Sequence, residues 1–235
     1  MKFSFSFFLF FTISVVFSQE KDIVILPAPM IAVDSLYRED QFYFGLTYNS
    51  LFNKAPGVSQ NKFSSGFVMG FLRDMPINKS RTVAIATGFG FSYNKSSQNL
   101  YLTKTNQDIE YSVIPSGQDY NKNKLDQLYF DVPIEFRWRT STPESHKFWR
   151  IYPGFKFSYV LWDRYTYVDS ESNFRIANNK DLNAFQMGAY LACGYNTWNF
   201  YAYYGLTPFF KSDAKIENTN VGLNTLNLGL MFYIL

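Results

Sequence analysis

An alternation of apolar and polar side chains with a period of two covers most of this 235-residue chain and constrains its fold more than any other feature. The clearest run spans residues 127–139. One face of this run holds Leu128, Phe130, Val132, Ile134, Phe136 and Trp138, and the other holds Gln127, Tyr129, Asp131, Pro133, Glu135, Arg137 and Arg139. Because successive side chains of a β-strand point to opposite faces, this period predicts a strand.

Seven further runs show the same alternation. They cover residues 42–49, 63–71, 83–93, 149–161 and 225–235, with two more beginning near Ala184 and Trp198. About eight antiparallel strands is the smallest common size for a membrane barrel. Short links are expected at residues 76–80, 140–147 and 196–197, and long polar loops at 53–62, 94–126, 163–183 and 211–224. Short turns at one end and long loops at the other are typical of up-and-down outer-membrane barrels with both termini in the periplasm.

The composition of the second face decides where the apolar face points. Aromatic residues make up 20% of the chain and charged residues only 17%, against about 25% charged residues in average soluble proteins. A soluble barrel or sandwich needs Lys, Glu and Asp on its water-facing side, but here that face is largely Gly, Ala, Ser, Asn and Tyr. We therefore expect a transmembrane barrel with the apolar face toward lipid and small residues around a narrow lumen. The alternative is a soluble sandwich with aromatic packing at one end.

The N-terminus has the composition of an export signal. Lys2 precedes an apolar stretch from Phe7 to Val16, which predicts a signal peptide over residues 1–18 with cleavage near Gln19. The stretch is too short for a membrane anchor, and no cysteine follows it to carry a lipid. Residues 19–40 are then a periplasmic lead, and residues 41–235 form the barrel domain. The expected location is the bacterial outer membrane.

Composition also limits the chemistry. One Cys and one His leave no basis for disulfide scaffolds, cysteine zinc sites or Cys/His catalysis, and a net charge of +3 gives no indication of nucleic-acid binding. We infer no catalytic residue, cofactor, metal or small-molecule substrate. His146 lies in the 140–147 link, expected on the periplasmic side, whereas barrel enzymes that act on surface substrates need their chemistry at the opposite rim. A solvated turn histidine is favoured there over a general base.

Six charged residues are expected to project into the lumen from two neighbouring strands. They are Asp131, Glu135, Arg137 and Arg139 on one strand, and Arg150 and Lys156 on the next. Buried charges need partners, so we expect a salt-bridge network that fills and stiffens the barrel. The functional alternative is a narrow conduit or a docking site for a partner.

Three tryptophans and two prolines bear on where the strands end. Trp138, Trp149 and Trp198 flank the short links, where a periplasmic aromatic girdle is expected. Pro133 and Pro153 lack the N–H that a closed barrel uses, so each is expected at a bulge or near a rim.

Two segments carry a resemblance to a known family. EFRWRTST, from Glu135 to Thr142, runs into FWRIY, from Phe148 to Tyr152. With the aromatic-glycine strands before them, these segments resemble the small outer-membrane barrels of Bacteroidota and, within them, the PorT (SprT) family, over residues 41–235. The resemblance implies a part in type IX secretion and, in gliding species, in motility. It implies an accessory or assembly component without enzyme activity, and it brings no catalytic residues.

Three functions therefore stay open. The first is a non-enzymatic barrel that supports protein secretion by contacting other secretion subunits while embedded in outer-membrane lipid. The second is a generic barrel resembling OmpX whose long loops bind surface ligands. The third is an outer-membrane lipid or peptide hydrolase using His146, which its expected position disfavours.

Overall fold

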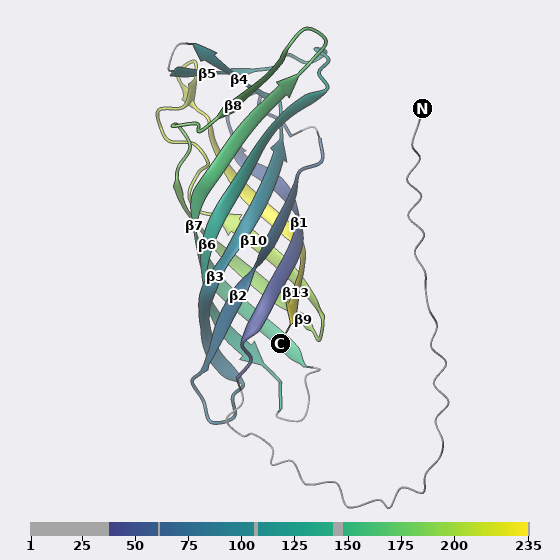
Figure 1. The fold of residues 1–235 in the computed structure, drawn as a ribbon, viewed down its shortest axis with the longest axis vertical. Helices are drawn as coiled ribbons and strands as arrows, with labels where there is room; N and C mark the ends of the chain where they lie inside the picture. Colours follow the sequence, from purple (N-terminus) through teal and green to yellow (C-terminus); the bar gives the residue numbers. More distant parts are fainter. Residues whose placement is uncertain (1–37, 61, 106–107, 143–147, 235) are drawn as a thin grey trace, which may run out of the picture. The chain divides into compact units, whose positions relative to one another are not determined.

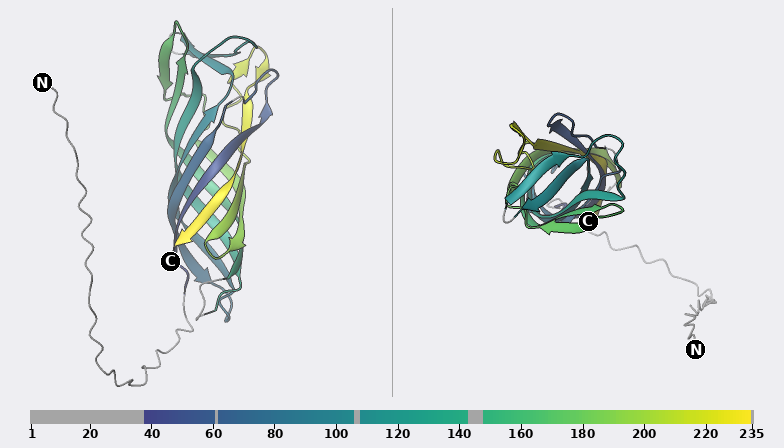
Figure 2. Two further views of the ribbon diagram at one scale, coloured as in Figure 1. Left: turned by 90° about the vertical axis from the view of Figure 1, so that its right-hand side faces the viewer. Right: turned by 90° about the horizontal axis from the view of Figure 1, so that it is seen from above.

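The computed structural model describes residues 38–60, 62–105, 108–142 and 148–234. In this part of the chain, eight long antiparallel strands close into a barrel (Figures 1 and 2). They are β1 (Gln41–Lys54), β2 (Ser65–Pro76), β3 (Val83–Ser97), β6 (Lys122–Arg139), β7 (Trp149–Val168), β9 (Phe185–Tyr195), β10 (Trp198–Gly205) and β13 (Gly222–Ile234). Each long strand pairs with the next along the chain, and β13 pairs with β1 to close the ring. The predicted up-and-down barrel is confirmed.

Short turns and long connections lie at opposite ends of this barrel. The register pairs Phe42 with Ile234, so β1 begins beside the end of β13. Figure 1 shows the chain's C-terminal end there, opposite the end that carries β4, β5 and β8. No helix in the described ranges is long and apolar enough to cross a membrane. The expected signal peptide and all but the last three residues of the expected lead lie outside the described residues.

The long connections contain more regular structure than their polar composition suggested. β3, β6 and β7 extend into them, and they carry five short strands: β4 (Leu100–Thr105), β5 (Asp108–Val113), β8 (Asn173–Ala177), β11 (Lys215–Ile216) and β12 (Thr219–Asn220). β4 pairs with β5, β11 pairs with β12, and β8 pairs with the extension of β7. The sequence predicts these connections only as long and polar, and it does not predict the short strands within them. The apolar residues within these segments pack together, as described below.

The apolar stripe faces outward, as the composition predicted. Phe42, Phe200 and Trp198 are 62%, 73% and 65% exposed, whereas the alternate Tyr43 and Tyr201 are each 5% exposed. The buried alternate positions carry polar, tyrosine and small side chains. On β6 the predicted faces hold from Tyr129 to Arg139 without a break.

Tyrosines fill the lumen because glycines on neighbouring strands leave room for them. A Cβ at Gly70 would lie 2.6 Å from Tyr43 Oη, and one at Gly154 would lie 2.8 Å from Tyr190 Cζ. A Cβ at Gly188 would collide with the ring of Tyr203. These close approaches explain why the second face combines glycine with large aromatic residues.

A β-bulge in β7 changes which of its residues face inward. Leu128 of β6 pairs with Trp162, but Tyr129 pairs with Val160, so Leu161 is an extra residue in β7. Between the short turns and the bulge, the even-numbered residues of β7 point into the lumen. Between the bulge and the loop end, the odd-numbered residues do.

Pro133 and Pro153 interrupt the ladder without a bulge. The pairing of β3 with β6 stops at Thr87–Ile134 and resumes in the same register at Gly90–Asp131, which spans Pro133. The pairing of β6 with β7 likewise stops at Glu135–Gly154 and resumes at Trp138–Ile151, which spans Pro153. The expectation of a bulge or rim position was wrong for both prolines, because the barrel accommodates each missing N–H within an unchanged register.

Candidate functional site

An ion-pair cluster occupies the lumen at the end with the short turns, and Asp74 of β2 is its centre. Its Oδ1 accepts hydrogen bonds from Arg137 Nη1 at 2.9 Å and Arg139 Nη1 at 2.7 Å, and its Oδ2 accepts one from Arg139 Nη2 at 2.7 Å. All three side chains are fully buried. β3 lies between β2 and β6, and it presents Ala84 and Ala86 there. These small side chains let the arginines of β6 reach Asp74.

Glu135 and Glu39 supply the other two carboxylates of the cluster. Arg137 Nε donates to Glu135 Oε2 at 2.9 Å, and Tyr190 Oη donates to Glu135 Oε1 at 3.0 Å. Arg137 Nη1 also donates to the Glu39 carbonyl oxygen at 3.0 Å, and Arg139 Nη1 lies 4.0 Å from Glu39 Oε2. Glu39 belongs to the segment predicted as the lead, yet it is 2% exposed.

Arg150 lies apart from the carboxylates and is held by aromatic rings. Its guanidinium carbon is 4.5 Å from the centroid of Phe148, 5.2 Å from that of Tyr233 and 5.8 Å from that of Tyr152. Within the described residues its Nε and Nη1 have no hydrogen-bond partner. Together with the two guanidiniums of the cluster, Arg150 balances the formal charge of the three carboxylates at this end of the lumen.

Asp131 and Lys156 form a separate ion pair in the lumen, further from the short turns than the Asp74 cluster. Lys156 Nζ lies 3.4 Å from Asp131 Oδ2, and Ser158 Oγ donates to Asp131 Oδ1 at 2.6 Å. The ammonium group also lies 4.5 Å from the centroid of Tyr203. The six sequence-predicted residues thus separate into this pair, the lone Arg150, and three members of the Asp74 cluster.

Side chains fill the space between these groups. Two cavities of about 10 Å³ each adjoin Lys156, one lined by Tyr43, Glu135 and Tyr190 and the other by Tyr129, Ser158 and Tyr203. A water molecule needs about 10–15 Å³, so each cavity has room for one at most. In the described residues the middle of the lumen is a packed core.

The loop end has a hydrophobic core of its own. Its largest buried side chains come from the extensions of β6 and β7, from the short strands and from the last long loop: Leu100, Leu102, Tyr111, Leu125, Tyr165, Tyr167, Ile176, Phe209, Phe210 and Leu223. Tyr111 Oη donates to Asp181 Oδ2 at 2.9 Å and accepts from Asn179 Nδ2 at 3.0 Å. Burial, reinforced by the Asp181 carboxylate, raises the pKa of the Tyr111 hydroxyl. These contacts fix the β4–β5 hairpin against the β8–β9 connection.

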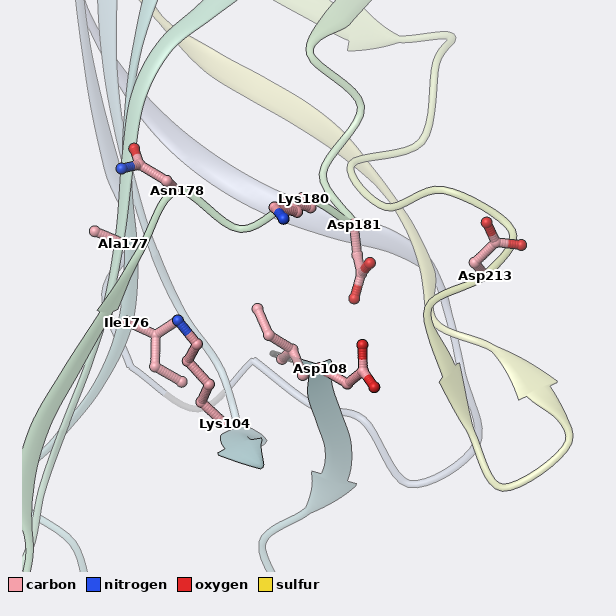
Figure 3. A pocket seen from close by; sticks show the side chains of 9 residues that line it. Lys104, Asp108, Ile176, Ala177, Asn178, Lys180, Asp181 and Asp213 are labelled. Atoms are coloured by element: carbon pink, nitrogen blue, oxygen red, sulfur yellow. The ribbon is translucent and has the colours of Figure 1, made fainter. Parts of the chain in front are cut away.

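A pocket of about 400 Å³ opens beside this core (Figure 3). The β4–β5 hairpin contributes Lys104 and Asp108, the segment after β8 contributes Lys180 and Asp181, and the last loop contributes Asp213. Figure 3 shows the carboxylates of Asp108 and Asp181 pointing toward one another from two different segments. No group of three metal-ligating side chains occurs among the residues that the structure describes. Both basic and acidic side chains line the pocket.

Tryptophans lie at both ends of the outer surface. Trp138, Trp149 and Trp198 are 43%, 60% and 65% exposed, and all three lie beside the short turns. Trp162 lies near the loop end, with the Arg164 guanidinium 4.9 Å from its ring centroid. His146 lies outside the described residues.

The comparison with protein families agrees with this geometry. Residues 17–211 match the family described as outer membrane protein beta-barrel domain. The chain belongs to this family. Its members are outer-membrane barrels, so the eight-stranded barrel with its outward apolar stripe is an outer-membrane β-barrel. A search of curated protein sequences finds no match.

Two solved structures are similar to this outer-membrane barrel. Both are crystal structures of Ail, the attachment invasion locus protein of Yersinia pestis, one of them in complex with the heparin analogue sucrose octasulfate. The TM-scores are 0.37 for the complex and 0.34 for the other structure. Each is 12% identical in sequence, and each comparison covers 84% of this chain and 100% of Ail.

Sequence reasoning missed Asp74 and Glu39. The second predicted run ends at Phe71, although the alternation continues through Leu72 to Asp74 on the inward face. Extending the period by three residues would have found the centre of the cluster. No periodic signal identifies Glu39, because it precedes β1.

Proposed function

We propose that this outer-membrane barrel is a non-enzymatic, non-conducting scaffold that presents a rigid loop end to a protein partner outside the cell. The observation that carries the proposal is the hydrophobic core of the loop end, in which Leu100, Leu102, Tyr165 and Tyr167 are each no more than 1% exposed. Ordering loops costs conformational entropy, and a surface that is ordered before binding loses less of it on association.

The packed lumen supports a scaffold and disfavours a conduit. Tyr129, Lys156 and Tyr203 line the small cavities in the middle of the barrel, and eight-stranded barrels have interiors that side chains fill. We propose that the ion-pair cluster stiffens this wall. The same proposal places both termini in the periplasm and makes Trp138, Trp149 and Trp198 the girdle at that interface.

The proposed partner is a subunit of a protein secretion system of the type IX kind. This part rests on the resemblance to the PorT (SprT) family in the segments from Glu135 to Thr142 and from Phe148 to Tyr152. The described part of these segments lies at the short-turn end, where it contains the arginines of the cluster. A role in gliding motility belongs to the same proposal.

The test uses a photo-crosslinking amino acid at two exposed positions. Position 213, beside the loop-end pocket, is expected to give adducts with one or a few proteins in intact outer membranes. Position 79, in a short turn, is the comparison for periplasmic contacts. Absence of any adduct at position 213 rules out the loop-end partner. Deletion of the gene with unchanged cargo secretion rules out the secretion role alone.

A second candidate is a barrel resembling OmpX that binds a surface ligand. The mixed-charge pocket of about 400 Å³ between Lys104, Asp181 and Asp213 favours it. Replacing Lys104 and Lys180 with Gln would weaken adhesion of whole cells in this case and leave cargo secretion intact. The opposite pattern would favour the secretion role.

A further inference from the structure

The strand register gathers basic side chains on the outer wall of the barrel, next to the loop end. Lys95 of β3 pairs with Asp126 of β6, which pairs with Arg164 of β7. One row further toward the loops, Lys124 pairs with Thr166, and Thr166 pairs with Arg175 of β8. Directly paired residues of antiparallel strands point to the same face. We call Lys95, Lys124, Arg164 and Arg175 the outer basic patch.

Asp126 holds two members of the patch in place. It is 0% exposed, although it lies on the outer wall. Its Oδ2 lies 2.7 Å from Lys124 Nζ and 3.7 Å from Arg164 Nη2, and its Oδ1 accepts a hydrogen bond from Tyr93 Oη at 2.8 Å. The side chains of Lys124 and Arg164 are still 25% and 37% exposed. Asp126 thus positions two cations without covering them.

The patch has a large excess of positive charge. In the two rows, the positions on β3, β6, β7 and β8 are Lys95, Asp126, Arg164 and Ala177, and Ser97, Lys124, Thr166 and Arg175. Four basic residues therefore face one carboxylate among the described residues of these rows. Unlike the Asp74 cluster, this group is not neutralised within the protein.

The height of the patch matches the edge of the membrane. The ten residue steps of β6 from Trp138 to Leu128 span about 34 Å along the strand, which a tilt of about 40° reduces to a height of about 26 Å. The apolar band of outer-membrane barrels is about 25 Å tall. Asp126 is the next outward residue of β6 beyond Leu128, so the patch begins where hydrocarbon gives way to headgroups.

We propose that the outer basic patch binds the phosphate groups of membrane lipids in the leaflet on the loop side. The exposed apolar wall below it, with Tyr93 and Phe91 on β3, is continuous with the patch. An amphiphile with an anionic head and acyl chains fits both surfaces at once. Arg164, which is positioned by Asp126 and by the ring of Trp162, can bind phosphate with two parallel N–H donors.

The test measures lipid binding by the refolded barrel in zwitterionic detergent. Native mass spectrometry counts bound phosphatidic acid, with phosphatidylcholine as the comparison lipid and glycerol phosphate as the same headgroup without acyl chains. The double variant Lys95→Gln/Arg175→Gln removes two charges and leaves the recorded contacts of Asp126 intact. Lys54→Gln/Lys79→Gln removes two exposed charges elsewhere and is the matched control.

The expected result is that phosphatidic acid binds the double variant about 25-fold more weakly, while the control variant binds like the wild type. The difference is expected to shrink as salt is added. Equal weakening in the patch and control variants, or no weakening in either, would overturn the proposal. Glycerol phosphate binding as tightly as phosphatidic acid would indicate a site for soluble anions and overturn it too. These outcomes do not depend on the partner at the loop end.

Discussion

Arg139 and Asp74 form a two-point ion pair across the width of a third strand, with Nη1–Oδ1 and Nη2–Oδ2 distances of 2.7 Å each. The pair joins β6 to β2 over the alanines of β3. Both side chains are removed from solvent, so each charge depends on the other. The consequences of breaking the pair are therefore asymmetric.

Removing one partner should be more damaging than removing both. Asp74→Asn leaves two buried guanidiniums without their shared carboxylate, and we expect it to lower the free energy of unfolding by about 3–5 kcal/mol. Asp74→Asn/Arg139→Gln should recover part of this loss, because it removes one orphaned charge. Urea unfolding in phosphatidylcholine vesicles measures both. A double variant less stable than Asp74→Asn would contradict the proposed pairing.

Adding a methyl group at Gly188 should be costly, because a Cβ there would collide with the ring of Tyr203. We expect Gly188→Ala to destabilise the barrel by about 1–3 kcal/mol. Tyr203→Leu in the same chain should restore part of that stability by vacating the space. Tyr203→Phe is the control that keeps the ring and removes only the hydroxyl, so it should restore less than Tyr203→Leu. The same unfolding assay distinguishes these outcomes.

A charged side chain on the apolar stripe should destabilise the barrel more near the middle of the bilayer than near its edge. Ile134 lies midway along β6 between Leu128 and Trp138 and is 43% exposed. Ile134→Arg should cost about 2–4 kcal/mol in a bilayer, falling to about 0–1 kcal/mol for Thr140→Arg beyond the girdle tryptophan. Equal costs at the two positions would mean that lipid does not contact Ile134.

The loop end should loosen at alkaline pH. Burial raises the pKa of Tyr111 above its usual value of about 10, so the folded state favours the neutral phenol. Its contribution to stability is complete below about pH 10 and is lost as the pH rises beyond that value. Cleavage by subtilisin within the β4–β5 hairpin should therefore accelerate as the pH rises above about 10. Tyr111→Phe, which cannot ionise, should show a smaller acceleration, and an identical pH profile would exclude Tyr111 as the cause.

The sequence was sufficient to predict the barrel because lipid exposure imposes a strict period. Every inward residue from Asp131 to Arg139 occupies the face that the alternation assigned to it. The partners of these residues were less predictable. Arg137 and Arg139 bind Asp74, which lies 63 and 65 residues away in the chain, and this contact depends on the small side chains at Ala84 and Ala86 of the strand between them. Periodicity reports which face a residue occupies but not how far its side chain reaches.

The loop-end core was missed for a different reason. Leu100, Leu102, Ile176 and Phe210 are separated by polar residues and by short strands. Such spacing gives no sustained period, so the alternation predicts long polar connections here and no core. Their apolar residues become a core only when three distant connections meet. The sequence signal is then the presence of large apolar residues within an otherwise polar loop.

The extra residue at Leu161 lets one continuous strand serve two different environments. On its short-turn side, Arg150 and Lys156 point into a polar, tyrosine-lined interior. On its loop side, Tyr165 and Tyr167 point into the hydrophobic core of the loop end. If β7 paired without the bulge and kept Leu161 in the alternation, both tyrosines would turn toward solvent and Arg164 toward the loop-end core. Removing Leu161 would instead abolish the bulge and keep both faces, so it is the bulge that reconciles the odd-numbered tyrosines with the even-numbered lumenal residues of the same strand.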